Sequence, residues 1–144
     1  MAHPPFDRVA LIGEHVRLEP LEDRHLSGLR SAADVDRSTF VLAAVPRPTD
    51  DDVRRYLDEA DSLHATARGL AFATIDVTSG TVVGSTRFMN AEYWTTPDRR
   101  ERPGVPPDAV EIGGTWLTPS AQRTGANTDA KLLMLAHAFD VLAV

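Results

Sequence analysis

The stretch that most constrains this fold is a strand, a polar turn and an apolar helix in immediate succession near the end of the chain. The letters AVEIGGTWL at 109–117 predict the strand, SAQRTGAN at 120–127 predicts the turn, and a helix is expected from about 126 to 142. Apolar residues cover most of that helix, so we expect it to be largely buried. Backbone N–H groups in such a turn can form a nest that binds phosphate at the helix N-terminus.

On the residues alone, two interpretations of this turn stay open. In the first it is a surface turn, in which Gly125 bends the chain and Asn127 caps the helix. In the second it holds an anion: Gly125 can take φ > 0 and lets a ligand approach the backbone closely, while Gln122 and Arg123 add donors. A Walker-type loop is excluded, because no Gly-Lys-Ser/Thr follows at the required spacing.

The rest of the chain predicts one α+β domain with a mixed sheet. A short edge strand is expected at 9–12 and a half-buried strand at 15–21. A helix is expected over roughly 24–33, followed by a second helix that Thr49 caps. Two strands, LAFATIDV and VVGSTRFMNAEYW, are joined by a hairpin turn, and the proline-rich segment 95–108 predicts an exposed loop. The order is strand, helix, helix, three antiparallel strands and helix. Within the last strand, the pair Gly113-Gly114 indicates a bulge or a close ligand approach.

Composition excludes several classes of function. The formal net charge of -6 argues against a general nucleic-acid binder, since such domains carry a basic face. The chain has no cysteine, which excludes disulfides, thiolate metal sites and a cysteine nucleophile. No apolar run approaches the ~20 residues that cross a membrane, and the N-terminus lacks a signal-peptide pattern. We therefore expect a soluble, cytoplasmic protein.

The run AVEIGGTWLTPSAQRTGANTDAKLLMLAHAFDVL resembles the GNAT superfamily of acetyl-CoA-dependent N-acetyltransferases, and its RimJ/RimL-like branch in particular. VRLEPLEDRHLSGL and GLAFATIDVTSGTVVGSTRFMN also resemble that branch, so the likeness extends from about residue 9 to 144. The sharpest motif is Gln/Arg-x-x-Gly-x-Gly/Ala, in which Asn127 here replaces the last residue. Thr-Gly-x-Asn-Thr followed by acidic-Ala-Lys is typical of the branch. The resemblance implies transfer of an acetyl group from acetyl-CoA to a primary amine, without a metal.

The resemblance also implies roles for individual residues. Glu111, at the cleft end of the last strand, would be the catalytic base, and its ordinary alternative is a solvent-facing strand carboxylate. The backbone of Trp116 and Leu117 would contact the pantetheine arm of CoA, and Thr128 and Lys131 are further candidates for contacts to CoA. The cradle for the pyrophosphate would consist of Gln122, Arg123, Thr124, Gly125, Ala126 and Asn127.

The family's fold continues beyond this pattern with a parallel fifth strand, another helix and a strand pair. We therefore expect residues 1–144 to form a single, incomplete GNAT domain, truncated before the fifth strand. The strand at 109–117 would then be an open edge, which predicts a homo-oligomer and doubtful activity in this form. Two alternatives to the enzyme remain: a non-catalytic GNAT-like module acting in CoA binding or protein assembly, and a phosphate-ligand binder unrelated to CoA. The amine acceptor would be a small molecule or a protein N-terminus.

Overall fold

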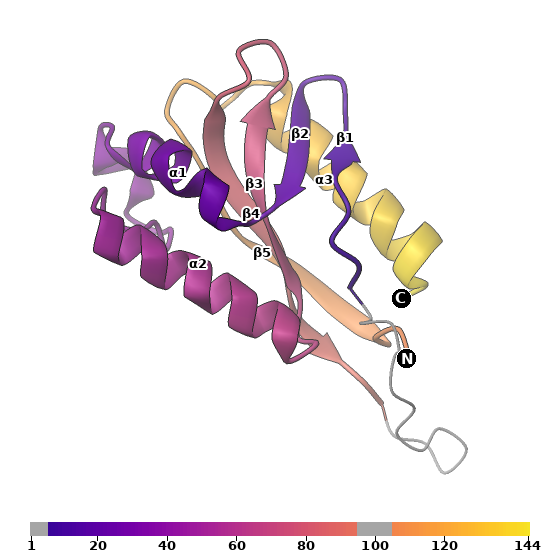
Figure 1. The fold of residues 1–144 in the computed structure, drawn as a ribbon. Coiled ribbons are helices and arrows are strands. Elements are labelled where there is room, and N and C mark those ends of the chain that lie inside the picture. The colour runs from indigo at the N-terminus through magenta and orange to yellow at the C-terminus, as the bar shows by residue number, and fades with distance from the viewer. Residues whose placement is uncertain (1–5, 95–104) are drawn as a thin grey trace.

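The fold is centred on an antiparallel sheet with helices on both faces (Figure 1). The structure, a computed structural model, describes residues 6–94 and 105–144. Strands follow one another across the sheet in the order β1-β2-β3-β4-β5, and each neighbouring pair is antiparallel. The strands are β1 (Leu11–Ile12), β2 (Val16–Pro20), β3 (Leu70–Asp76), β4 (Val82–Glu92) and β5 (Ala109–Leu117). The α-helices are α1 (Leu26–Ala33), α2 (Asp50–Ala65) and α3 (Gly125–His137).

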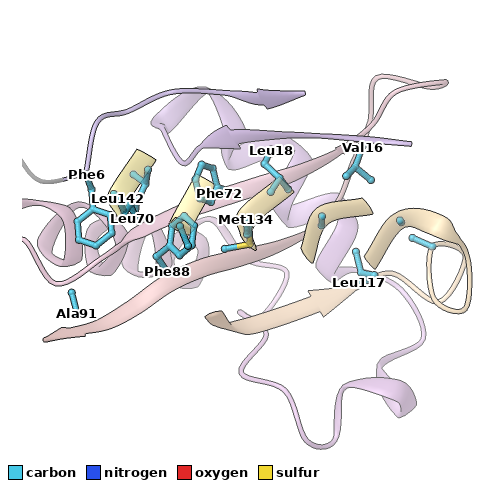
Figure 2. Packing of buried hydrophobic residues seen from close by; sticks show 14 residues of the cluster. Phe6, Val16, Leu18, Leu70, Phe72, Phe88, Ala91, Leu117, Met134 and Leu142 are labelled. Atoms are coloured by element: carbon cyan, nitrogen blue, oxygen red, sulfur yellow. The ribbon is translucent and has the colours of Figure 1, made fainter. Parts of the chain in front are cut away.

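Each face of the sheet has its own core, because strand residues alternate between the two faces. On the α3 side, Phe72, Phe88 and Met134 are fully buried and pack together (Figure 2). On the other side, α1 and α2 pack against the sheet around Trp116. The predicted order of elements is confirmed, and the short edge strand expected at 9–12 is present as the two-residue β1.

The helix α2 begins as the sequence predicted. The Oγ1 atom of Thr49 accepts a hydrogen bond from the Asp52 amide at 3.2 Å, which caps the helix. Three aspartates occupy the first turn, where negative charge suits the positive end of the helix dipole. The apolar side of the helix then faces the sheet through Val53, Tyr56 and Leu57.

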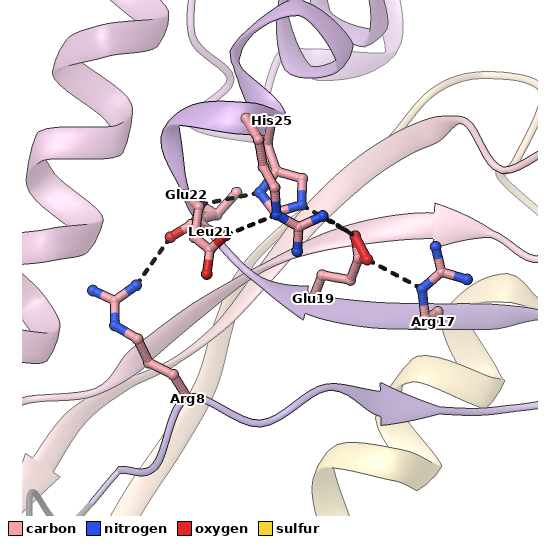
Figure 3. A network of polar contacts seen from close by, with 7 residues as sticks. Arg8, Arg17, Glu19, Leu21, Glu22 and His25 are labelled. Atoms are coloured by element: carbon pink, nitrogen blue, oxygen red, sulfur yellow. Dashed lines mark hydrogen bonds and ion pairs between the residues drawn. The ribbon is translucent and has the colours of Figure 1, made fainter.

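A polar network fixes the passage from β2 to α1 (Figure 3). The carboxylate of Glu19 pairs with Arg17 at 3.1 Å and with Nε2 of the buried His25 at 3.2 Å. Since His25 Nδ1 accepts from the Glu22 amide at 3.0 Å, Nε2 carries the proton and donates to Glu19. Burial opposes ionisation of Glu19, yet these hydrogen bonds outweigh it and lower the pKa of the carboxyl.

The predicted bulge in β5 is confirmed. Between the pairs Ser85–Trp116 and Arg87–Gly113, β4 advances two residues while β5 advances three. The extra residue is accommodated at Gly114, whose φ of 57° is in the left-handed region that favours glycine.

The helix α3 differs from its prediction in two respects. It begins at Gly125, and Thr124 caps it in place of Asn127, because the Thr124 Oγ1 accepts from the Ala126 amide. It is also buried on one side only: Met134 is fully buried, whereas Leu132 is 65% exposed. A five-residue π-helical segment, Ala138–Leu142, continues it, and there Phe139 is 63% exposed.

Within the described residues, no helix is long and apolar enough to cross a membrane. Of the predicted loop at 95–108, residues 95–104 lie outside the described part of the chain.

Candidate functional site

The turn between β5 and α3 is held by its own backbone. The Thr118 amide donates to the Val83 carbonyl at 2.7 Å, and the Thr118 carbonyl accepts from the amides of Ala121 and Gln122. The Thr124 hydroxyl donates to the Ala121 carbonyl at 2.6 Å. These bonds fix the path of the chain into α3 without any ligand.

Arg123, and not Gly125, takes the left-handed conformation in this turn, with a φ of 56°. Gly125 therefore does not use the positive φ that a glycine permits. Gly125 is needed for space instead, since a Cβ there would lie 2.9 Å from Cδ2 of His15. The absence of a side chain lets α3 begin directly beside the segment that precedes β2.

Free amide groups are concentrated at this turn. The backbone N–H groups of Arg123, Thr124 and Gly125 donate to no acceptor among the described residues. The first N–H groups of an α-helix have no partner within the helix, and together with the helix dipole they attract anions. The side chain of Arg123 is exposed at the same place and adds a positive charge.

Two hollows flank the turn, and they divide the predicted CoA residues between them. One, of about 260 Å³, lies beside the end of β5 and the segment 39–43. The other, of about 310 Å³, lies toward His15 and Asp76 and is lined by Thr124, Gly125 and Ala126. Five other predicted cofactor residues line the first hollow: Trp116, Leu117, Gln122, Arg123 and Asn127.

The side chains of several predicted cofactor residues serve the fold. Trp116 and Leu117 are buried, so their backbone is the part of them available to a ligand. The side-chain amide of Gln122 donates to the Thr39 hydroxyl at 3.1 Å and to the Leu117 carbonyl at 2.9 Å. These bonds tie the turn to the wall of the first hollow. Ala126 is buried in the core, and the exposed Thr128 lines neither hollow.

Lys131 points toward the sheet. Its ammonium donates to the hydroxyls of Thr115 at 2.6 Å and Thr86 at 3.2 Å, and burial lowers its pKa. The geometry therefore offers no support for Lys131 as a contact to a phosphate at the turn.

Glu111 lies exposed on β5, where its Oε2 accepts a hydrogen bond from the Asn90 side-chain amide at 2.7 Å. Asn90 has a φ of 50° at a second irregularity, where β4 gains one residue on β5. Met89 is the cross-strand neighbour of Glu111. This hydrogen bond fixes the orientation of the carboxylate without burying it.

A third cavity, of about 410 Å³, lies between α2, the segment 44–47 and β4. Arg87, Met89 and Gly114 form its wall on the sheet. Sequence reasoning missed Arg87 altogether. The strand period held the signal, because Arg87 is two residues from Ser85 and so lies on the face that α2 covers.

The fold is similar to that of solved acetyltransferases. The family model described as the acetyltransferase (GNAT) domain matches residues 15–144, and the chain belongs to this family. A solved GCN5-related N-acetyltransferase from Brucella melitensis is 30% identical, with a TM-score of 0.71, and the alignment covers 96% of this chain and 58% of that chain. No curated protein sequence matches significantly.

Two further solved structures share the fold at lower identity. RimJ from Mycobacterium smegmatis, in complex with CoA-disulfide, is 16% identical with a TM-score of 0.75, over 99% of this chain and 66% of that one. A ribosomal-protein-S5-alanine acetyltransferase from Vibrio fischeri is 15% identical with a TM-score of 0.67, over 92% and 68%. Across four solved acetyltransferases at 23–30% identity, the chain spans 58–62% of the other protein's length.

Proposed function

We propose that this chain carries the acetyl-CoA site and part of the acceptor site of an N-acetyltransferase that acts on a primary amine. One observation carries the proposal: at the bulge in β5, the adjacent residues Gly114 and Thr115 line two different cavities. The cavity at Thr115 leads to the turn with the free amides, and the cavity at Gly114 leads to α2. Acetyl-CoA in the first cavity and an amine in the second would meet at the bulge.

The residues at the end of β5 and around the turn into α3 suit CoA. The free N–H groups of Arg123, Thr124 and Gly125 and the exposed Arg123 side chain would hold its pyrophosphate. One edge of β5 pairs with β4, and no described strand pairs with the other edge. The backbone of Trp116 and Leu117 would contact the pantetheine arm along that edge. Gln122 would stabilise the turn and not contact CoA, since its side-chain amide already donates to Thr39 and Leu117.

Glu111 is the proposed base. Acetyl transfer forms an amide bond, breaks the thioester C–S bond and requires the amine to lose one proton, while the CoA thiolate that leaves takes up one proton to become the thiol. The carboxylate of Glu111, oriented by Asn90 on the wall next to Met89, would take this proton directly or through water. Its exposure leaves it open to both an amine and a water molecule.

Binding is tested by calorimetric titration with acetyl-CoA. We expect the wild type to bind, Gly125→Trp to lose binding and Arg123→Glu to bind more weakly by at least about tenfold. Gly80→Trp is the matched control, because nothing lies within 4 Å of a Cβ at Gly80. Equal affinity for all four proteins contradicts the proposed CoA site. Arg123→Glu keeps the test decisive if Gly125→Trp does not fold.

Transfer is tested by release of the CoA thiol, which a thiol reagent detects without background because the chain has no cysteine. We expect Glu111→Gln to lower kcat by about 10²- to 10⁴-fold with little change in acetyl-CoA affinity. Unchanged turnover removes Glu111 from the mechanism. Binding of acetyl-CoA without turnover favours a non-catalytic GNAT module.

A second proposed function is assembly with another copy of the chain. One edge of β5 pairs with no described strand and so carries backbone donors and acceptors for a partner strand, and α3 and the π-helical segment expose Leu132, Leu135 and Phe139. Unpaired strand edges and exposed apolar patches favour association. Light scattering is expected to give a dimer or larger species, and Phe139→Lys to shift it toward monomer. A well-folded wild-type monomer rules assembly out.

A further inference from the structure

The cavity against α2 has the size of a small-molecule site. Its volume of about 410 Å³ falls within the range of ligand pockets, roughly 300–1,000 Å³. Apolar side chains such as Val45 and Met89 form part of the lining, and three arginines and two carboxylates form the charged part. These charged residues are Arg47, Asp52, Arg55, Glu59 and Arg87.

Arg87 differs from the other two arginines of this cavity. Arg55 pairs with Asp52 at 3.2 Å and Arg47 approaches the same carboxylate at 3.8 Å, and both are well exposed. The side chain of Arg87 takes part in no ion pair or hydrogen bond that the described residues form. Its Nε is buried and has no acceptor among the described residues, which is unfavourable for a charged group. The N–H donors of this guanidinium are therefore available to a ligand.

The side chain of Arg87 is held in place although its donors are free. Its stem lies against Gly114, where a Cβ would come within 2.9–3.1 Å of Nε, Cδ and Cγ. Its Cζ lies 5.0 Å from the centre of the Tyr56 ring. The Tyr56 hydroxyl donates to Ser85 at 2.9 Å and accepts from the Trp116 indole at 3.2 Å, so the ring itself is fixed. A guanidinium fixed in this way loses little entropy when it binds.

The position of Arg87 relates it to the proposed base. Arg87 pairs with Gly113 and Met89 pairs with Glu111, so all four residues lie on one face of the sheet. Met89 lines the cavity between Arg87 and Glu111, and a Cβ on Gly113 would lie 2.8 Å from its Sδ and 3.4 Å from Oε1 of Glu111. The cavity therefore extends from Arg87 to Met89, which is the cross-strand neighbour of Glu111.

We propose that this cavity binds an acceptor that carries an anionic group, a carboxylate or a phosphate, in addition to its amine, and that Arg87 binds that group. The naming of the ligand as an acceptor rests on the proposed acetyl transfer, whereas the anion site does not. The planar guanidinium suits carboxylate and phosphate oxygens in a bidentate arrangement. Tyr56, Gly114 and Ser85 position Arg87 for this contact.

The anion site is tested by NMR, independently of activity. Inorganic phosphate and acetate are titrated separately while the Nε–H resonance of Arg87, assigned by its loss in Arg87→Lys, is followed. We expect a saturable shift of that resonance and a smaller shift of Arg55, whose charge is already paired. Sodium chloride at equal ionic strength is the control. If phosphate and acetate shift the resonance no more than sodium chloride does, the proposal is overturned.

The substrate class is tested with matched acceptors. Alanyl-alanine is compared with its C-terminal amide, and phosphoethanolamine with ethanolamine, in the thiol-release assay. We expect the anionic member of at least one pair to have a kcat/KM higher by about 10- to 100-fold, and Arg87→Gln to abolish the preference while Arg55→Gln retains it. Equal rates within both pairs overturn the substrate class. If no amine is acetylated, the acetyl-transfer proposal fails, and the NMR titration still decides the anion site.

Discussion

Arg87 and Lys131 are two partly buried cations on opposite faces of the sheet, and they are treated in opposite ways. Lys131 reaches the sheet from α3 and donates to two threonine hydroxyls, Thr115 and Thr86. Arg87 lies on the α2 face beside a cavity, between Gly114 and the Tyr56 ring, and its Nε has no acceptor among the described residues. Burying a charge is costly unless its donors are satisfied.

The difference separates a structural cation from a binding cation. Residues of the sheet accept the hydrogen bonds of Lys131, so this cation helps to pack α3 against the sheet. The donors of Arg87 stay unused within the described structure, while neighbouring residues fix its position. The four expected outcomes below test this contrast through the free energy of unfolding, from the largest change to the smallest.

Replacing Gly114 with valine should have the largest effect. The left-handed backbone alone costs about 1–2 kcal/mol for a residue with a Cβ, and contact with the Arg87 stem adds overpacking of about 1–3 kcal/mol. We expect urea unfolding to show a loss of about 3 kcal/mol. Gly80→Val, at φ 70° with open space, should lose only the backbone part. Equal losses at the two glycines would show that Gly114 does not hold Arg87.

Asp129 is the reference case of a charge whose partners are fixed. Its Oδ2 accepts from the backbone amides of His15 at 2.8 Å and Val16 at 3.0 Å. Burial acts to raise its pKa, but these hydrogen bonds outweigh it and the pKa is lowered. We expect Asp129→Asn to lose about 2 kcal/mol near neutral pH, measured by urea unfolding.

The pH dependence of this difference has a defined sign. Because the folded pKa of Asp129 is lowered, its contribution is present above the unfolded value of about 3.9 and is lost as the pH falls through the folded pKa. Wild type and Asp129→Asn should therefore converge in acid. A gap that persists at the lowest pH at which both proteins fold argues against the charged hydrogen bonds.

Replacing Lys131 with methionine should change stability less, by about 1 kcal/mol or under at neutral pH, since the lost hydrogen bonds are offset by the removal of a buried charge. Burial lowers the pKa of Lys131, so the unfolded chain binds more protons between the folded pKa and about 10.4. Wild-type stability should rise with pH in this window, and the variant should lose that rise.

Lys131 is the single lysine of the chain, so its titration can be read directly by ¹³C NMR of the side chain. A midpoint at the ordinary lysine value would contradict the buried arrangement with Thr115 and Thr86.

Arg87→Gln should have the smallest effect on stability. The variant loses the contact with the Tyr56 ring, worth about 0.5–1 kcal/mol, and gains by removing an Nε that is buried without an acceptor. We expect a net change within about 0.5 kcal/mol, together with the loss of anion binding. A large destabilisation would make Arg87 a structural group like Lys131 and would end the contrast.

Local patterns in the sequence were sufficient for much of this protein. The Thr49 cap, the β3–β4 hairpin, the bulge at Gly113-Gly114 and the order of the elements were all predicted, because each depends on residues close together in the chain. The family resemblance, carried by the run from the last strand through α3, was confirmed by the match over residues 15–144. The roles of Glu111 and of the turn residues stay predictions.

Only the tertiary structure decided what those residues touch. Gly125 is needed because His15, more than a hundred residues earlier in the chain, lies against it. Lys131 turns to threonines on two strands, and α3 exposes apolar residues because only one of its sides meets the sheet. The role proposed for Arg87 also depends on the tertiary structure, since the lack of a hydrogen-bond acceptor can be seen only when the neighbouring residues are placed. Periodicity gives the face on which a residue lies, and the packing of distant segments determines whether its charge is satisfied there.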